Sequence, residues 1–282
     1  MGAARSLEAY ETDWSRPTVF YNHTVKWGVY LVTILFLIWN VWEARVSFDR
    51  LIYGAGQAGV LLGAFFPPDF GITVTAGGIE TSDRFWRIYD GMVETLAMSI
   101  VATVAGVLVS IPVAVMGAEN LAPRPVYYVG RAIISVTRAI HELIIGIVVV
   151  VGFGFGALAG VIALVFATPG FYAKLLAEDL EDIDQSRLEA IRSTGASPLQ
   201  VLIYGVLPQV LPRVIGLTIY RWDINLRAST ILGVVGAGGI GAALLTSFDT
   251  YEYDFSMGIL LTIIAFVVLG EMLSAYARRR VQ

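Results

Sequence analysis

The sequence has no cysteine, few histidines and little charge. Its 282 residues include no cysteine and only two histidines, which excludes disulfides, a thiol nucleophile, cysteine-ligated metal sites and a histidine-rich metal centre. Charged residues make up 15% of the chain, whereas a soluble domain carries about 25%. The formal net charge of −4 argues against a nucleic-acid-binding protein. The sequence therefore offers no residues for such a metal centre, and no catalytic residue set is visible in it.

Hydrophobic residues dominate instead. They make up 56% of the chain, and the mean hydropathy is +0.71. Such values indicate a polytopic membrane protein, so the predicted fold class is all-α, a transmembrane helical bundle. A span needs about 20 residues. Six predicted spans meet that length approximately: Trp27–Val46, Gly91–Met116, Gly130–Val151, Ala157–Ala177, Leu207–Asn225 and Phe255–Tyr276.

The remaining sequence divides the chain into three parts. Residues 1–25 are polar and of mixed charge, which predicts a cytoplasmic tail and not a signal peptide. Residues 26–90 hold the first span and an extracytoplasmic segment, in which an interfacial or extracytoplasmic helix is expected to stop at Pro67-Pro68. Its later, polar part is either a docking surface for a binding protein or an ordinary loop. Residues 91–282 form the core.

One polar stretch, Ser186–Pro208, interrupts the apolar sequence and predicts a helix–turn–helix elbow. Asp184 is suited to cap a first helix, and Gly195 to end it in a left-handed turn. Ser197-Pro198 begins a second helix, because serine caps well and proline fits the first helical position. The second helix carries one apolar stripe, formed by Leu199, Leu202, Ile203 and Val206.

The third predicted span contains ionisable residues close to the bilayer midplane. Arg138, His141 and Glu142 are spaced i, i+3, i+4, which predicts that they lie on one face of the helix. Ionisable groups at this depth are expensive and indicate a functional site that faces protein or water. An internal Arg138–Glu142 ion pair that only orients helices explains them equally well, and both interpretations stay open.

The fifth predicted span carries Arg221, Asp223 and Arg227. Asp223 and Arg227 are four residues apart and can pair if the helix continues, whereas Arg221 lies on another face and is available to a different anion. The glycine-rich segment Ser229–Phe248 contains a G-x-G-x-x-G pattern, but no strand–helix–strand unit surrounds it. The glycines instead predict a re-entrant or broken helix packed within protein.

Charge bias sets the predicted topology. Arg278-Arg279-Arg280 ends the chain and belongs on the cytoplasmic side by the positive-inside rule. Six spans place both termini and the elbow on that side, in the cell (inner or plasma) membrane.

Two patterns resemble a known family. Glu189-Ala190-Ile191, Gly195 and Leu207-Pro208 resemble the signature loop of binding-protein-dependent ABC importer permeases, with Ile191 in place of an alanine and Gly205 in place of an isoleucine. The stretch from Arg221 to Gly241 resembles phosphonate-type permeases. So does the stretch from Arg138 to Leu143, where His141 stands in place of a proline.

The resemblance implies a type I ABC importer permease, expected as a homodimer in membrane lipid, with separate ATPase subunits that carry ATP and Mg and an extracytoplasmic substrate-binding protein. It implies import of phosphonate, phosphate or phosphite. The chain has no phosphate-binding loop of its own, so it is expected to be a transport subunit without cofactors and not an enzyme.

The coupling loop spans 179–208. The residues expected to couple to the ATPase are Glu189, Ala190, Ile191, Gly195, Ala196, Leu207 and Pro208. Those expected along the substrate pathway are Arg138, His141, Glu142, Arg221, Asp223 and Arg227.

Two other functions compete with this one. An ABC permease for methionine or another small solute would share the elbow, but the arginines of the fifth span favour an anion. A proton-coupled secondary anion transporter would use Glu142 or Asp223, and it predicts transport by this chain alone. A membrane-embedded hydrolase would need a carboxylate pair or a metal cluster, and the sequence offers neither.

Overall fold

The computed structural model describes residues 22–44, 47–75 and 78–281. Most of the predicted cytoplasmic tail, and the predicted end of the first span at Val46, lie outside these ranges. The chain divides into two compact units, Met1–Gly63 and Ala64–Gln282.

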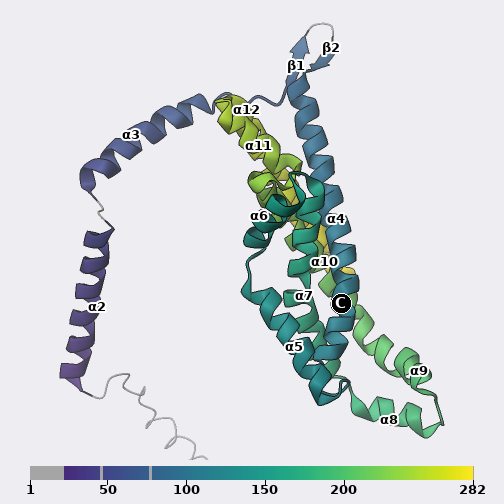
Figure 1. The fold of residues 1–282 in the computed structure, drawn as a ribbon. Helices are drawn as coiled ribbons and strands as arrows, with labels where there is room; N and C mark the ends of the chain where they lie inside the picture. The colour runs from purple at the N-terminus through teal and green to yellow at the C-terminus, as the bar shows by residue number, and fades with distance from the viewer. Residues whose placement is uncertain (1–21, 45–46, 76–77, 282) are drawn as a thin grey trace, which may run out of the picture. The chain divides into compact units, whose positions relative to one another are not determined.

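Two helices occupy the described part of the first unit. Helix α2, His23–Glu43, is long and apolar enough to cross a membrane (Figure 1). Helix α3, Phe48–Ala64, ends before the two prolines, as predicted. Its interfacial position stays a prediction.

The second unit begins with a hairpin that the sequence did not lead us to expect. Strand β1, Ile72–Thr75, pairs antiparallel with β2, Gly78–Thr81, with Ile72 opposite Thr81. The hairpin directly precedes α4, Asp83–Gly117. Each strand has only four residues, too few for a clear alternating pattern of apolar residues.

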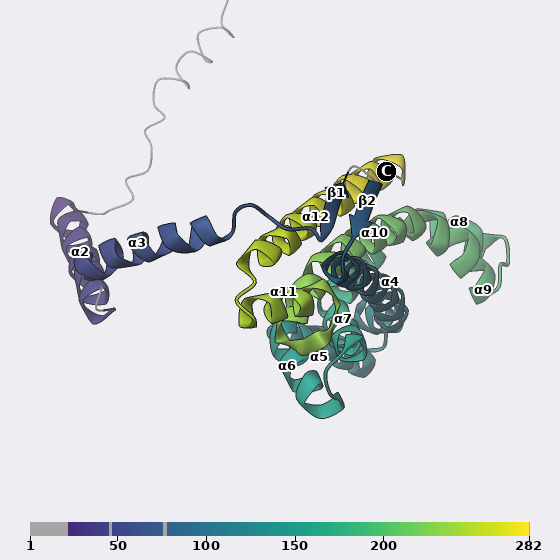
Figure 2. The same cartoon turned by 90° about the horizontal axis from the view of Figure 1, so that it is seen from above.

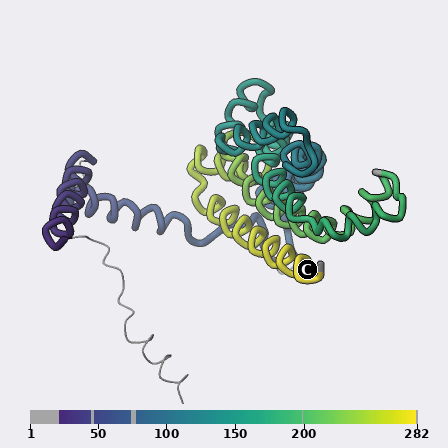
Figure 3. Tube along the Cα trace, turned by 90° about the horizontal axis from the view of Figure 1, so that it is seen from below, coloured from purple at the N-terminus to yellow at the C-terminus, as the bar shows by residue number. Residues whose placement is uncertain are grey.

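Helices make up most of the remainder of the described second unit (Figures 1 and 2). They are α5 Arg124–Ala139, α6 Glu142–Phe153, α7 Ala157–Glu181, α8 Gln185–Ser193, α9 Pro198–Val201, the π-helix η1 Leu202–Val206, α10 Leu207–Leu232, the π-helix η2 Gly233–Ala237, α11 Gly239–Asp249 and α12 Tyr253–Val281. Helix α4 packs against α7, α10 and α11. Helices α8 and α9 project from one end of this bundle, as the view from below also shows (Figure 3).

Five helices in the described residues are long and apolar enough to span a membrane, or six if α5 and α6 count as one bent span. The predicted spans therefore recur, but the third is not one continuous helix. Helices α5 and α6 are bent by 86° across Ile140-His141. The prediction that Arg138, His141 and Glu142 share one helix face was wrong for this reason.

Close packing accompanies this break. Gly170 of α7 lies against the end of α5, where a Cβ on Gly170 would stand 2.7 Å from the backbone N of Arg138. After the break, His141 caps α6, and its Nδ1 accepts a hydrogen bond from the backbone N–H of Leu143 at 3.2 Å. The absent side chain at Gly170 and the capping imidazole together accommodate a helix end inside the bundle.

The core lies where α4, α7 and α10 meet. Tyr172 is fully buried there, and its hydroxyl is 3.0 Å from the Oγ1 of Thr218. A Cβ on Gly106 of α4 would come within 2.6 Å of the Oγ1 of Thr168, so glycine permits close approach of α4 and α7.

Candidate functional site

The elbow forms as its capping residues predict. The Asp184 side chain accepts a hydrogen bond from the backbone N–H of Ser186 at 3.0 Å and so caps α8. This hydrogen bonding, first that of Ser186, lowers the pKa of Asp184. After α8 the chain turns at Gly195, whose φ is +77°. These features confirm the predicted first helix and its glycine end.

The second arm starts with a reciprocal cap. The Ser197 backbone N–H donates to the Oε1 of Gln200 at 2.8 Å, and the Gln200 N–H donates to the Oγ of Ser197 at 3.4 Å. Helix α9 then passes through η1 directly into α10, which begins at Leu207 as predicted. Proline donates no backbone hydrogen bond and crowds the carbonyl four residues earlier, and the wider π turn accommodates Pro208 there.

The apolar stripe of the second arm is largely exposed. Leu199, Leu202 and Ile203 are 64%, 52% and 43% exposed, while Val206 is buried. A cavity of about 400 Å³ lies beside them, lined by residues of the elbow and by Leu121, which follows α4. Among the coupling candidates, Glu189 and Ala190 are exposed and Ile191 is partly buried. The elbow therefore presents both charged and apolar groups.

The charged residues of the fifth span separate into two groups. In the first group, Arg221 is only 3% exposed, and its Nη2 lies 4.0 Å from the Oε2 of Glu142. Its Nε donates to the Oγ1 of Thr168 at 3.2 Å. Arg221 thus joins the start of α6 to α7 and α10. In the described residues Glu142 pairs with Arg221 and not with Arg138, contrary to the helix-orienting ion pair considered above.

Arg221 keeps unused hydrogen-bonding capacity. Its Nη2 makes no hydrogen bond within the described part of the chain. A buried guanidinium donor without an acceptor is costly. Its nearest carboxylate, Glu142, stands at the limit of ion-pair distance.

The second group pairs as the spacing predicts. Arg227 forms an ion pair with Asp223, one turn earlier on α10, and Asp223 is buried. Nearby on the same helix, Asn225 donates from Nδ2 to the Oγ1 of Thr103 on α4 at 2.9 Å. Asp223 Oδ1 and Asn225 Oδ1 have no hydrogen-bond partner in the described residues. One helix therefore places several incompletely satisfied polar atoms inside the bundle.

The glycine-rich segment is a broken helix, as predicted. Gly236, Gly238 and Gly239 have φ angles of +95°, +80° and +70°, and they separate α10 and η2 from α11. The new helix start exposes backbone N–H groups, but α4 supplies acceptors. Glu94 Oε2 accepts from the Gly239 N–H at 2.8 Å, and Thr95 Oγ1 accepts from the Ile240 N–H at 2.9 Å.

Glu94 was missed by the sequence analysis. It stands in α4, where the neighbouring residues supply most of an apolar span, and an ionisable residue in such a setting is a recognisable signal. Its partner is a backbone group 145 residues later, which no spacing rule connects to it.

An ion-pair clasp ties the hairpin end of the second unit together. Arg84 pairs with Asp69, Asp254 and Glu252, which joins the segment before β1 to the starts of α4 and α12. The Gly71 backbone N–H donates to Asp69 at 2.7 Å. This hydrogen bond, together with Arg84, lowers the pKa of Asp69. The clasp was not predicted, because its members are far apart in the sequence.

The broken third span, the projecting elbow and the helical core define the fold of a type I ABC importer permease. The inward-facing MetNI methionine ABC transporter has a chain with this fold, at TM-score 0.62 and 24% identity over 72% of this chain and all of that chain. Residues 106–282 match the family described as the binding-protein-dependent transport system inner membrane component. The chain belongs to this family, and it is therefore a multi-pass transport subunit of the inner membrane.

Its relatives include permeases for phosphorus oxyanions. The phosphite transport system permease protein PtxC of Stutzerimonas stutzeri is 41% identical over 247 residues, which cover 87% of this chain and 85% of that protein. The phosphate-import permease protein PhnE of Mycolicibacterium smegmatis is 41% identical over 194 residues, or 68% of this chain and 36% of that protein.

Proposed function

We propose that this chain forms the translocation pathway of an ATP-driven importer for a phosphorus oxyanion, of the phosphonate, phosphite or phosphate class. Two copies form the pathway. Separate ATPase subunits bind ATP and Mg and dock on the elbow, and an extracytoplasmic protein delivers the anion. The single observation that carries the substrate class is Arg221, a guanidinium buried in the helical bundle whose Nη2 makes no hydrogen bond in the described residues. The names of the relatives agree with this class.

Arginine suits this substrate chemically. Its planar fork donates parallel hydrogen bonds to two oxygens of one phosphorus centre. Glu142, 4.0 Å from Arg221, balances the charge when no anion is present. A transported anion has to leave again, and a nearby carboxylate weakens its binding enough for release.

The same helix supports coupling. From Leu199 to Arg221 the chain is helical throughout α9, η1 and α10, a rise of about 33 Å at 1.5 Å per residue. A push on the elbow by an ATPase subunit therefore reaches the buried arginine without crossing a loop.

Uptake by the reassembled complex tests this function. Proteoliposomes containing the permease, its ATPase and its binding protein are expected to take up phosphite or phosphonate when ATP is supplied, and not methionine. Arg221→Gln is expected to abolish uptake while the complex stays assembled. ATP-independent uptake by the permease alone, driven by a proton gradient, would instead identify a secondary transporter.

The orientation of the ends belongs to the same proposal. Both termini and the elbow face the cytoplasm, because the last turn of α12 carries Arg278, Arg279 and Arg280. The chain lacks cysteine, so a single cysteine placed at Ser193 or Arg279 gives a clean reporter. A membrane-impermeant maleimide is expected to label both in inside-out vesicles and neither in intact cells. Labelling on opposite sides would refute the shared orientation.

A further inference from the structure

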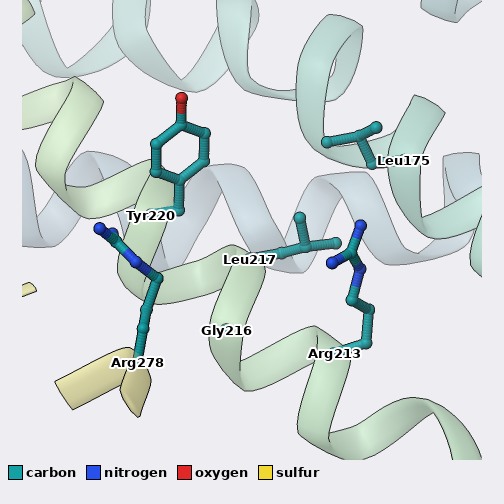
Figure 4. Close-up of a pocket in the computed structure, with 6 residues that line it drawn as sticks. All are labelled: Leu175, Arg213, Gly216, Leu217, Tyr220 and Arg278. Atoms are coloured by element: carbon teal, nitrogen blue, oxygen red, sulfur yellow. The ribbon is translucent and has the colours of Figure 1, made fainter. Parts of the chain in front are cut away.

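A second basic site lies on the bundle, apart from the Arg221 group. A cavity of about 260 Å³ opens between α7, α10 and α12 (Figure 4). Its lining residues are Leu175, Arg213, Gly216, Leu217, Tyr220 and Arg278. Tyr220 is 40% exposed, whereas its neighbour Arg221 is buried, so this cavity and the Arg221 group occupy different faces of α10.

The two arginines retain free donors. Arg213 uses its Nε on the two carboxylate oxygens of Asp179, at 3.2 and 3.0 Å, and its two Nη groups make no hydrogen bond in the described chain. Arg278 uses Nη1 on the Oγ of Ser274, and its guanidinium lies 5.4 Å from the centre of the Tyr220 ring. Two guanidinium groups against one carboxylate leave a net positive charge at the cavity.

The arrangement suits an oxyanion attached to an apolar body. Figure 4 shows the guanidinium groups of Arg213 and Arg278 on either side of Leu217. The Tyr220 side chain extends in the same direction as the two arginine side chains. Leu217 lies between the two guanidinium groups, and Leu175 adds a second apolar residue to the lining. The cavity is smaller than the roughly 300–1,000 Å³ of pockets for drug-sized ligands, which favours a single small anionic group.

The position of the cavity near two helix ends also favours a small anionic group as its ligand. Arg213 stands in the second turn of α10, and Arg278 in the last turn of α12. Both positions are at the helix ends that the proposed topology makes cytoplasmic. Basic pockets between helices on that side bind phosphate-bearing headgroups.

We propose that this cavity binds a phosphate-type oxyanion through Arg213, Arg278 and Tyr220. Two sources supply such a group: the headgroup of an anionic phospholipid, or a free phosphorus oxyanion that leaves the pathway. Only the second source rests on the proposed transport function. Binding of the headgroup would anchor α10 to α12 at the membrane surface.

Binding to the purified full-length chain tests this site. Native mass spectrometry in neutral detergent would compare phosphatidylglycerol, phosphatidylcholine, inorganic phosphate and phosphite as separate probes. Arg278→Gln is expected to weaken anion binding about tenfold or more, since it removes a charge-assisted hydrogen bond. Arg279→Gln removes the same charge from the neighbouring, exposed residue and is expected to leave binding unchanged. Tyr220→Phe gives a milder variant that keeps the packed ring.

Each outcome decides the proposal. Binding of phosphatidylglycerol but not phosphatidylcholine, lost in Arg278→Gln and retained in Arg279→Gln, identifies the lipid headgroup. The same pattern with phosphate or phosphite identifies the free anion. The site is overturned if no probe binds, or if Arg279→Gln and Arg278→Gln weaken binding equally. Lipid binding without any uptake of phosphorus oxyanions by the complex would leave this site standing and refute only the transported substrate.

Discussion

Ile191 and Gly205 lie against each other where the two arms of the elbow meet. A Cβ on Gly205 would be 3.2 Å from Ile191 Cδ1 and 2.7 Å from Leu188 Cδ2. These are the two positions at which the sequence departs from the signature-loop pattern, with isoleucine in place of alanine and glycine in place of isoleucine. The larger side chain on one arm thus fills the space that the smaller residue leaves on the other.

This compensation predicts non-additive effects. Gly205→Ile alone is expected to overpack the elbow, and Ile191→Ala alone to leave a cavity, each costing about 1–3 kcal/mol of stability. The double variant Ile191→Ala/Gly205→Ile restores the total volume. Its melting temperature in detergent should exceed that of at least one single variant, and additive losses would contradict the pairing.

The positive φ at Gly195 predicts loss of docking on substitution. Gly195→Val places a β-branched residue at a φ of +77°, which costs about 1–2 kcal/mol or distorts the turn. The ATPase subunit should co-purify with the wild type and be reduced with this variant. Thr194→Val adds the same side chain at the adjacent negative φ of −80° and serves as the control. Equal recovery of the ATPase with both variants would contradict a role for the turn.

Glu142 is expected to stabilise the bundle through Arg221. Glu142→Gln leaves a buried guanidinium uncompensated and should cost about 3 kcal/mol, seen as a lower melting temperature. Replacing both, as Glu142→Gln/Arg221→Met, should recover part of this loss because no unpaired charge remains. If the double variant is less stable than Glu142→Gln, Arg221 stabilises the fold through other contacts.

Glu94 is expected to hold the start of α11. Glu94→Gln keeps an acceptor for the Gly239 N–H and should preserve most of the stability, whereas Glu94→Ala leaves that N–H unpaired and should cost about 1–3 kcal/mol. Limited proteolysis and melting temperature measure the difference. Equal loss in the two variants would mean that the charge of Glu94, and not its hydrogen bond, supports the helix.

The clasp at Asp69 predicts acid sensitivity. The folded protein lowers the pKa of this carboxyl below its ordinary value of 3.8, so its contribution to stability is complete above that pH and disappears as the pH falls further. The melting temperature of the wild type should therefore drop more steeply below pH 4 than that of Asp69→Asn. Parallel curves for the two proteins would contradict a native-state preference for the ionised form.

Local signals in the sequence predicted the elements that local chemistry determines. Asp184, Gly195 and Ser197 define the elbow because capping and turn formation depend on a few neighbouring residues. The break at Ile140-His141 did not follow from the sequence, because no proline or glycine stands there and the contact with Gly170 comes from another helix. For the same reason a pair between Glu142 and Arg138, four residues away, was one of two interpretations that the sequence left open, and Glu142 pairs instead with Arg221.

The contact of Glu94 with Gly239 also bears on how the protein is made. Glu94 is translated with α4, and the backbone N–H from which it accepts a hydrogen bond is translated 145 residues later. During that interval the carboxylate has to be tolerated by the insertion machinery or by water. The bundle is therefore completed late in biogenesis, and nascent chains that stop before α11 should remain targets for membrane quality-control proteases.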